Sequence, residues 1–385
     1  MSWNRSQMGA HLLCMFALGC AVLPESLASS GVTLSTLTMT PESVAVNVGS
    51  SLQFNITGTW SDGSTTIPPV TYSATGGTVA QSGIFSAGNV PGEFIVLVEH
   101  VPSGKRDTSK VAVQVPAGTL ANECASPRTG WIWCDDFDSN RLASYFEVDS
   151  ADGSFTRTNG VGNNGSYGMR ARWSIGQVSA GALHLALGLT PQPYIRSADA
   201  GGARHRDLYW RIYLRNQAGW VGGGGDKLSR AFVFASPASF AQAMIAHVWS
   251  GDDDSNYENV LALDPARGTD ANGILRTTGY NDFANLSFLG IANGTVNLFA
   301  PSNVGIWHCI EARARLNDAG MNNGVTELWI DGVMDASRSG LNFLGSFDTY
   351  GLNAIYLENY WNAGSPAAQE RYFDNFVVST SRIGC

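Results

Sequence analysis

Residues 205–215 read His-Arg-Asp-Leu-Tyr-Trp-Arg-Ile-Tyr-Leu-Arg, and from residue 208 onward the pattern alternates strictly. Leu208, Trp210, Ile212 and Leu214 fall on one face of a strand, and Tyr209, Arg211, Tyr213 and Arg215 fall on the other. The apolar face requires a core, whereas tyrosine and arginine together suit a surface for a polar, anionic ligand. We therefore predict a strand whose polar face is the floor of a ligand groove. The plainer alternative is an edge strand whose long side chains only cover the sheet.

The overall composition favours an exported, all-β protein. The chain has 385 residues, enough for two or three domains; only 14% of them are charged, and 44 are glycine. A net charge of −9 argues against a protein that binds nucleic acid through a broad basic surface. The segment from Arg204 to Arg215 is a local exception, with four arginines against one aspartate. A local basic groove is compatible with this acidic chain.

Residues 1–28 are predicted to form an export signal. Arg5 and His11 precede an apolar run that covers residues 12–23, and Ser26-Leu27-Ala28 supplies small residues for cleavage. The run is too short to span a membrane. Ala17-Leu18-Gly19-Cys20 offers an alternative as a weak lipoprotein signal, in which Cys20 carries the lipid. Simple secretion is the preferred interpretation, and either route takes the mature chain out of the cytoplasm.

Four cysteines remain after removal of that signal, namely Cys124, Cys134, Cys309 and Cys385. An even number in an exported protein predicts two disulfides, with three connectivities open. The most local pairing joins Cys124 to Cys134 and Cys309 to Cys385. Pairing Cys124 with Cys385 and Cys134 with Cys309 instead suits a fold whose first and last strands lie side by side. The sequence has no Cys-x-x-Cys pair, which argues against a metal site made of these residues.

Residues 32–116 form a first predicted domain. Short strand-like runs are separated by turn signals such as Trp60-Ser61-Asp62-Gly63-Ser64, a pattern that indicates a β-sandwich. Residues 37–41, 48–54, 59–64 and 111–113 resemble the bacterial immunoglobulin-like domains of group 2. The resemblance implies a spacer or adhesive module without catalysis. Residues 117–123 then form a short linker.

Residues 124–385 form the second predicted domain. Their many strand-like runs, with hardly any helical periodicity, favour one large two-sheet jelly roll. The opening Cys134-Asp135-Asp136-Phe137, the closing residues 373–379 and the hairpin of residues 305–313 and 324–332 resemble concanavalin-like jelly rolls. With the Arg/Tyr strand and residues 226–230, they are similar to secreted polysaccharide lyases of that fold, of the heparin-lyase-like and glucuronan- or alginate-lyase-like kinds. We predict an all-β chain, in which an immunoglobulin-like β-sandwich precedes a concanavalin-like β-jelly roll.

That resemblance implies β-elimination on an acidic polysaccharide. The enzyme must neutralise a uronate carboxylate, remove a proton from the adjacent carbon and protonate the leaving oxygen, tasks that suit Arg, Lys, Asn, His and Tyr. We predict His247, Tyr360 and Arg211 as catalytic groups. The predicted substrate-binding residues are Tyr209, Tyr213, Arg215, Lys227, Arg230, Trp249, Glu358 and Asn362. Structural alternatives stay open: His247 suits a packed core position, and Glu311, Arg313 and Glu327 suit cross-strand ion pairs.

The sequence has no clear motif for hydrolysis of a glycosidic bond, the competing reaction. A retaining glycoside hydrolase of this fold carries Glu-x-Asp-x-x-Glu on one strand, and the sequence lacks that string. The predicted chemistry requires no cofactor, and Asp136 with Asp374 is a candidate structural Ca²⁺ site. The sequence therefore predicts a secreted protein that binds and cleaves a uronate-containing polysaccharide. A non-catalytic carbohydrate-binding or adhesive cell-surface protein is the alternative.

Overall fold

The computed structural model describes residues 31–88, 92–114, 123–222, 225–251 and 259–385. The predicted export signal with Cys20, residues 117–122 of the predicted linker and the acidic stretch 252–258 lie outside these ranges. Within them strands dominate, and no helix is long and apolar enough to cross a membrane. The helical segments are short 3₁₀ turns: η2 (Glu123–Ala125), η3 (Leu142–Ser144), η4 (Ala151–Gly153), η5 (Asn163–Gly165) and η6 (Phe283–Asn285).

A smaller unit at the N-terminal end has a core of its own. Its strands carry alternating apolar residues, and the inward ones, such as Phe54, Phe85 and Val96, are fully buried together. The first sheet contains β1 (Leu34–Thr40), β4 (Asn55–Trp60) and β5 (Thr65–Thr66). The second contains β2 (Ser43–Asn47), β10 (Lys105–Gln114), β9 (Gly92–His100) and β6 (Thr71–Ala74). The third contains β3 (Ser51–Gln53), β8 (Ile84–Ser86) and β7 (Thr78–Val79). The resemblance to group 2 immunoglobulin-like domains stays a prediction.

The larger unit is built on two eight-stranded sheets, and the first of them is called here the β16 sheet. Its strands pair in the order β13 (Phe155–Asn159), β14 (Tyr167–Trp173), β26 (Gln369–Ser379), β16 (Asp207–Asn216), β22 (His308–Arg315), β23 (Gly324–Ile330) and β24 (Val333–Leu341). The eighth strand, β11 (Trp131–Asp135), pairs with β26, so the first and last strands of this unit do lie side by side.

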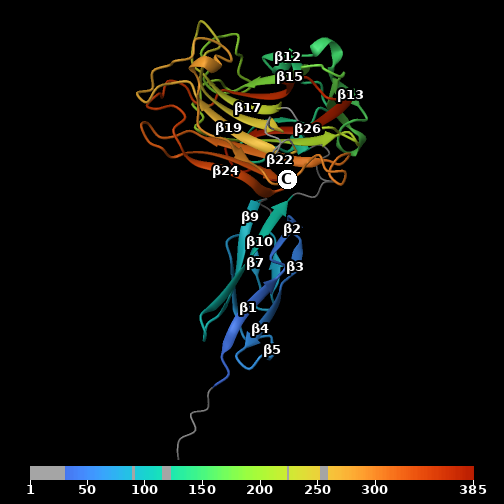
Figure 1. The fold of residues 1–385 in the computed structure, drawn as a ribbon, viewed down its shortest axis with the longest axis vertical. Helices are drawn as coiled ribbons and strands as arrows, with labels where there is room; N and C mark the ends of the chain where they lie inside the picture. The colour runs from blue at the N-terminus through green and yellow to red at the C-terminus, as the bar shows by residue number, and fades with distance from the viewer. Residues whose placement is uncertain (1–30, 89–91, 115–122, 223–224, 252–258) are drawn as a thin grey trace, which may run out of the picture.

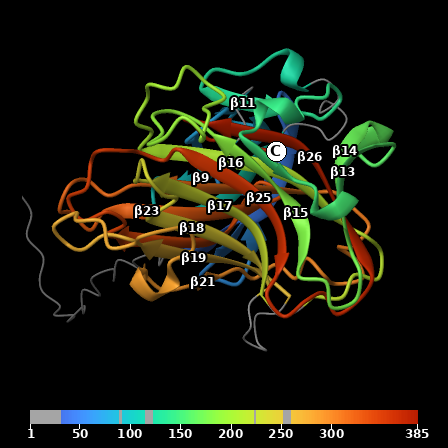
Figure 2. The same cartoon turned by 90° about the horizontal axis from the view of Figure 1, so that it is seen from above.

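The second large sheet is called here the β17 sheet. Its strands pair in the order β12 (Glu147–Asp149), β15 (Ser179–Ala186), β25 (Ala354–Trp361), β17 (Asp226–Phe234), β18 (Gln242–Ser250), β19 (Leu261–Arg267) and β20 (Ser287–Phe288). The eighth strand, β21 (Ala292–Asn293), pairs with β19. Figure 2 looks onto this sheet, with β25, β17, β18 and β19 running side by side.

The two large sheets bury one continuous apolar core, as expected of a jelly roll. The apolar half of the predicted β16 pattern is confirmed: Leu208, Trp210, Ile212 and Leu214 are at most 2% exposed and belong to this core. In Figure 1 the β17 sheet lies on the side away from the smaller unit, while β22 and β24 of the β16 sheet lie toward it. The backbone N–H of Met334 on β24 donates to the Glu93 carboxylate of the smaller unit at 2.6 Å. Any site on the outer face of the β17 sheet is therefore remote from the smaller unit.

Two disulfides form with the local pairing. Cys124 bonds to Cys134 and Cys309 bonds to Cys385. The alternative pairing between the ends of the unit does not occur, although β11 and β26 are neighbours. Each bond instead ties one end of the larger unit to a strand of the β16 sheet. Structural disulfides of this kind are typical of proteins that fold outside the cytoplasm.

Candidate functional site

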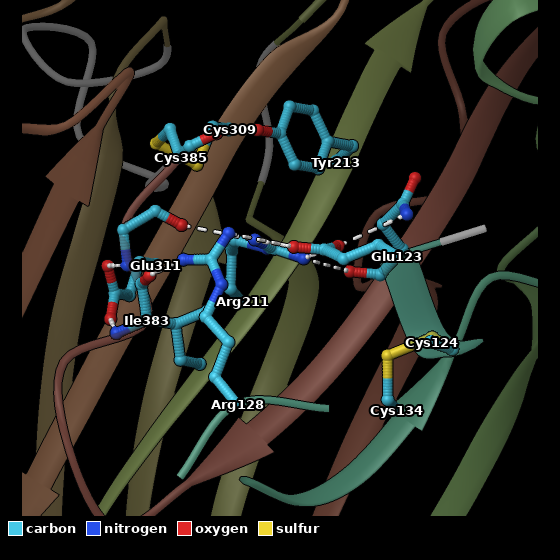
Figure 3. Close-up of polar contacts among 12 residues, drawn as sticks. Glu123, Cys124, Arg128, Cys134, Arg211, Tyr213, Cys309, Glu311, Ile383 and Cys385 are labelled. Carbon is cyan, nitrogen blue, oxygen red and sulfur yellow. Dashed lines mark hydrogen bonds and ion pairs between the residues drawn. A yellow bond between two sulfur atoms is a disulfide. The ribbon is translucent and has the colours of Figure 1, made fainter. Parts of the chain in front are cut away.

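The polar face of β16 is not the floor of a groove, which corrects the prediction made for Arg211. The Arg211 guanidinium donates to both carboxylate oxygens of Glu123 and to the backbone carbonyls of Asn375 and Gly384 (Figure 3). Arg211 is 0% exposed, because η2 and the C-terminal residues cover it. Both Nη atoms are used in these hydrogen bonds, and Nε, which has no partner among the described residues, is buried, so the guanidinium cannot reach a sugar carboxylate. Its role here is to hold the two ends of the larger unit onto the sheet.

The other polar residues of β16 also contact protein rather than a cavity. The Tyr213 hydroxyl donates to the carbonyl of Cys385 at 2.7 Å. Tyr209 stacks on Trp329 with ring centroids 6.1 Å apart. Arg215 donates to the carbonyl of Val161 at 3.0 Å and lies between two aromatic rings. The predicted substrate-binding role of these three residues is therefore not supported, and Arg211, His247 and Tyr360 do not share one groove.

A cavity on the outer face of the β17 sheet does collect five of the predicted residues. It has a volume of about 460 Å³ and lies over β15, β25 and β17. The predicted residues that line it are Lys227, Arg230, Glu358, Tyr360 and Asn362. Alternation along β25 explains part of this grouping, because Glu358 and Tyr360 face outward while Leu357 and Trp361 join the core. We call this space the cationic cavity, after Lys227 and Arg230.

A bulge in β17 brings Lys227 and Arg230 to the same face. Residues three positions apart on a regular strand point to opposite sides. The pairing of β17 with both β18 and β25 shifts register between Lys227 and Ser229, which inserts the extra residue that returns Arg230 to the outer face. Leu228 within the shift points inward and is fully buried in the core.

The Arg230 charge is already paired within the cavity wall. Its Nε and Nη2 donate to the two carboxylate oxygens of Glu358, and Nη2 also donates to the Tyr280 hydroxyl. Its Nη1 donates to Asn281 Oδ1 at 2.8 Å. The Arg230 side chain is 1% exposed and the Glu358 side chain 7%. This buried bidentate pair therefore holds the cavity wall in place and does not by itself attract an anion. The amide nitrogen of Asn281 has no hydrogen-bond acceptor among the described residues, and it remains available to a ligand.

Lys227 is the amine of the cavity, and its surroundings favour the neutral form. Its Nζ lies 4.1 Å from the centroid of the Tyr360 ring and 5.9 Å from that of Trp249. Burial first, and then the charge of Arg230, lowers the pKa of Lys227 to about 8, although Glu358 and Asp226 act in the opposite direction. An amine with this pKa is partly unprotonated near neutral pH and can accept a proton.

His247 and Trp249 lie on β18, next to Lys227 and Arg230 on β17, and do not line the cationic cavity. His247 pairs with Arg230 across β17 and β18, is 1% exposed and stacks on Trp249 at 5.0 Å. Burial first, and then the charges of Arg230 and Lys227, holds the pKa of His247 well below its usual range. The imidazole is therefore neutral. Its predicted role as a group that touches substrate is not supported by this position, and the packed alternative fits better.

A second cavity adjoins the first and was not predicted. It has a volume of about 440 Å³ and shares His184 and Tyr280 with the cationic cavity. Its other lining residues are Glu147, Gln192, Tyr194, Phe240 and Tyr356. His184 stacks on Tyr356 with centroids 3.7 Å apart and contacts Glu147 Oε2 at 3.0 Å through Nδ1. We call this space the aromatic cavity.

Sequence reasoning missed the groups that loops contribute. Tyr280 and Asn281 lie in a loop and not in a strand. Asn281 has a positive φ of 53°, a conformation that asparagine tolerates better than most residues. No periodic pattern predicts where such a turn lies. His184 could have been predicted, since it interrupts the apolar run from Ala180 to Ala186.

Asp374, one of the two residues predicted to hold Ca²⁺, is hydrogen-bonded by the protein backbone. The Asp374 carboxylate accepts hydrogen bonds from the backbone of Asn163 at 2.6 Å and of Asn375 at 2.8 Å. Burial is the main cause that raises the pKa of Asp374 to about 7, and Asp138, rather than Asp136, adds to it. Among the described residues no three His, Cys, Asp or Glu side chains gather in a way that suits a metal ion. Calcium binding stays a prediction.

Comparison with solved structures finds distant likenesses. An endo-β-1,4-glucuronan lyase from the fungus Trichoderma reesei matches with a TM-score of 0.44 and 14% identity, over 65% of this chain and 95% of its own. A marine alginate lyase from Aplysia kurodai has a TM-score of 0.44 and 12% identity, over 66% of this chain and 100% of its own. An alginate lyase from a Chlorella virus has a TM-score of 0.42 and 11% identity, over 62% and 100%. No family model and no curated protein matches the chain. Since these TM-scores are below 0.5, the function proposed next rests on the side chains of the cavities.

Proposed function

We propose that this protein binds a uronate-containing polysaccharide over β15, β25 and β17 and cleaves it by β-elimination. The observation that carries the proposal is the pair of Lys227 and Tyr360 in the cationic cavity. The lysine is 6% exposed with a pKa lowered to about 8, and its Nζ lies 4.1 Å from the centroid of a tyrosine ring that is 40% exposed. A lysine that is partly unprotonated near physiological pH, beside an accessible phenol, supplies the base and the acid that proton removal and proton delivery require.

The proposed reaction moves one proton and breaks one bond. The neutral Lys227 amine takes the proton from the carbon next to the sugar carboxylate. The electron pair left on that carbon forms a double bond to the neighbouring carbon, whose bond to the glycosidic oxygen breaks. The Tyr360 hydroxyl gives its proton to the leaving oxygen, and the lysine ammonium returns a proton to the phenolate. No water or cofactor is consumed.

Stabilising the substrate carboxylate falls to Asn281 in this scheme. Removal of the adjacent proton is easier when the carboxylate charge is held by hydrogen bonds, because negative charge builds up there in the transition state. Asn281 Oδ1 accepts from Arg230 at 2.8 Å, which polarises the amide and fixes its orientation. Asn362, also on the cavity wall, supplies a second amide.

An ultraviolet assay tests the proposal directly. The full-length protein is incubated with alginate, glucuronan, heparin-like and pectic polymers, and the absorbance of the unsaturated product is followed. We expect product from at least one polymer, none with Lys227→Met, and unchanged activity with Lys105→Met, an exposed lysine of the smaller unit. Binding of these polymers without product would replace the enzyme with the alternative, a non-catalytic carbohydrate-binding protein.

A further inference from the structure

The two adjoining cavities have different chemistry. In the cationic cavity Lys227 has no carboxylate partner among the described residues. In the aromatic cavity the titratable groups other than tyrosine are Glu147 and His184, which contact each other at 3.0 Å. The hydrogen bond from His184 is the main cause that lowers the pKa of Glu147, so this carboxylate is ionised at neutral pH. A second uronate carboxylate would therefore meet a negative charge there and no unpaired cation.

The walls of the aromatic cavity suit the faces of a sugar ring instead. Tyr194 is 55% exposed and Tyr280 is 42% exposed, so both rings present apolar surface to the space. The stacked pair of His184 and Tyr356 adds a flat surface beside them.

Tyr194 is exposed but held in place. Its ring contacts Phe146 and Phe240 edge to face, with centroids 6.1 Å and 5.9 Å away. The loop that carries it is fixed where Gln192 donates from Nε2 to the carbonyl of Ser239 at 3.1 Å. An exposed ring with fixed neighbours binds a ligand face without the entropic cost of ordering it.

We propose, on the basis of the function proposed above, that the aromatic cavity is a subsite for an uncharged sugar unit adjoining the uronate in the cationic cavity. The shared feature of the units it accepts is a ring without a free carboxylate, either a neutral sugar or a uronate whose carboxyl group is esterified. The preferred substrate is then a mixed polysaccharide rather than a uniform polyuronate. Glu147 rejects the charged unit, and Tyr194 and Tyr280 bind the uncharged one.

Paired substrates of equal length test this assignment. Initial rates are measured on a uniform polyuronate, on a polymer in which the same uronate alternates with a neutral sugar, and on the uniform polymer after partial methyl esterification. We expect kcat/KM to be at least about tenfold higher on the alternating or the esterified polymer, a difference equivalent to about 1.4 kcal/mol. Whichever of the two is preferred distinguishes a neutral sugar from an ester.

Two variants locate the preference in the aromatic cavity. Tyr194→Ala should raise KM on the preferred polymer by roughly tenfold and leave the rate on the uniform polyuronate nearly unchanged. Glu147→Gln, which keeps the size and removes the charge, should improve the rate on the uniform polyuronate. Phe288→Ala, an aromatic residue that is 51% exposed outside both cavities, is the matched control and should change neither.

The subsite can be tested separately from the proposed elimination reaction. Calorimetric titration of the Lys227→Met variant with the same polymers measures binding when no elimination occurs. The same order of affinities would support the subsite even if the protein proves to be non-catalytic. Equal or tighter binding of the uniform polyuronate, with no effect of Glu147→Gln, would overturn it.

Discussion

The Arg211 guanidinium and the Glu123 carboxylate form an enclosed ion pair between residues 88 positions apart in the chain. Asn375 donates from Nδ2 to the same carboxylate at 3.2 Å, and Arg128 lies 3.8 Å from it. Figure 3 shows this cluster next to the C-terminal residues, where Glu311 accepts from the backbone N–H groups of Ile383 and Gly384. The cluster therefore connects the start of the larger unit, its middle and its end.

Replacement of Arg211 is expected to affect stability and not the groove. Arg211→Ala leaves the buried Glu123 carboxylate without its main partner, which costs about 3–5 kcal/mol of unfolding free energy. The double variant Arg211→Met with Glu123→Leu should lose less, because neither charge is then left buried. Urea unfolding measures both. If Arg211→Ala keeps full stability and loses polymer binding, the polar face of β16 is a ligand surface after all.

The two disulfides should contribute unequally. The Cys309–Cys385 bond closes a loop of 76 residues and the Cys124–Cys134 bond one of 10. Loop-closure entropy alone then predicts about 4.5 kcal/mol for the first and about 2.7 kcal/mol for the second. Thermal unfolding of Cys309→Ser with Cys385→Ser, against Cys124→Ser with Cys134→Ser, checks the order. The mature protein, denatured without a reductant, should react with no thiol reagent. The reverse order of stabilities would show that local strain outweighs chain entropy.

The sequence predicted the faces of strands but not what covers them. Alternation placed Trp210 in the core, and it placed Glu358 and Tyr360 together on the opposite side of β25 from Leu357, as the structure has them. The same alternation on β16 led to a wrong prediction for Arg211. The sequence pattern of an outward-facing arginine is the same whether solvent, a ligand or another part of the chain covers it. The residues that cover it come from positions far away along the chain, and no local pattern reports them.

Asn281 is expected to matter for catalysis more than for folding. Asn281→Gly removes the amide and tolerates the φ of 53° at this position, so the turn should be kept. Loss of a hydrogen bond to a charged group costs about 1.5–3 kcal/mol, which lowers kcat/KM by about ten- to a hundredfold. Asn272→Gly, an exposed asparagine in the described loop before Asn281, is the control. Wild-type rates for Asn281→Gly would assign the carboxylate to another group, with Asn362 the next to test.

The pH dependence of the reaction should report Lys227. Its pKa is lowered to about 8, mainly by burial, and only the neutral amine accepts a proton, so kcat should rise as the pH passes through about 8 and then level off. Lys227→Met should remove the activity and this limb of the profile together. Lys227→Arg keeps the positive charge but stays protonated at every working pH, so it should bind polymer and release no product. Activity that Lys227→Met leaves in place and His184→Gln abolishes would move the base from Lys227 to the histidine between the two cavities.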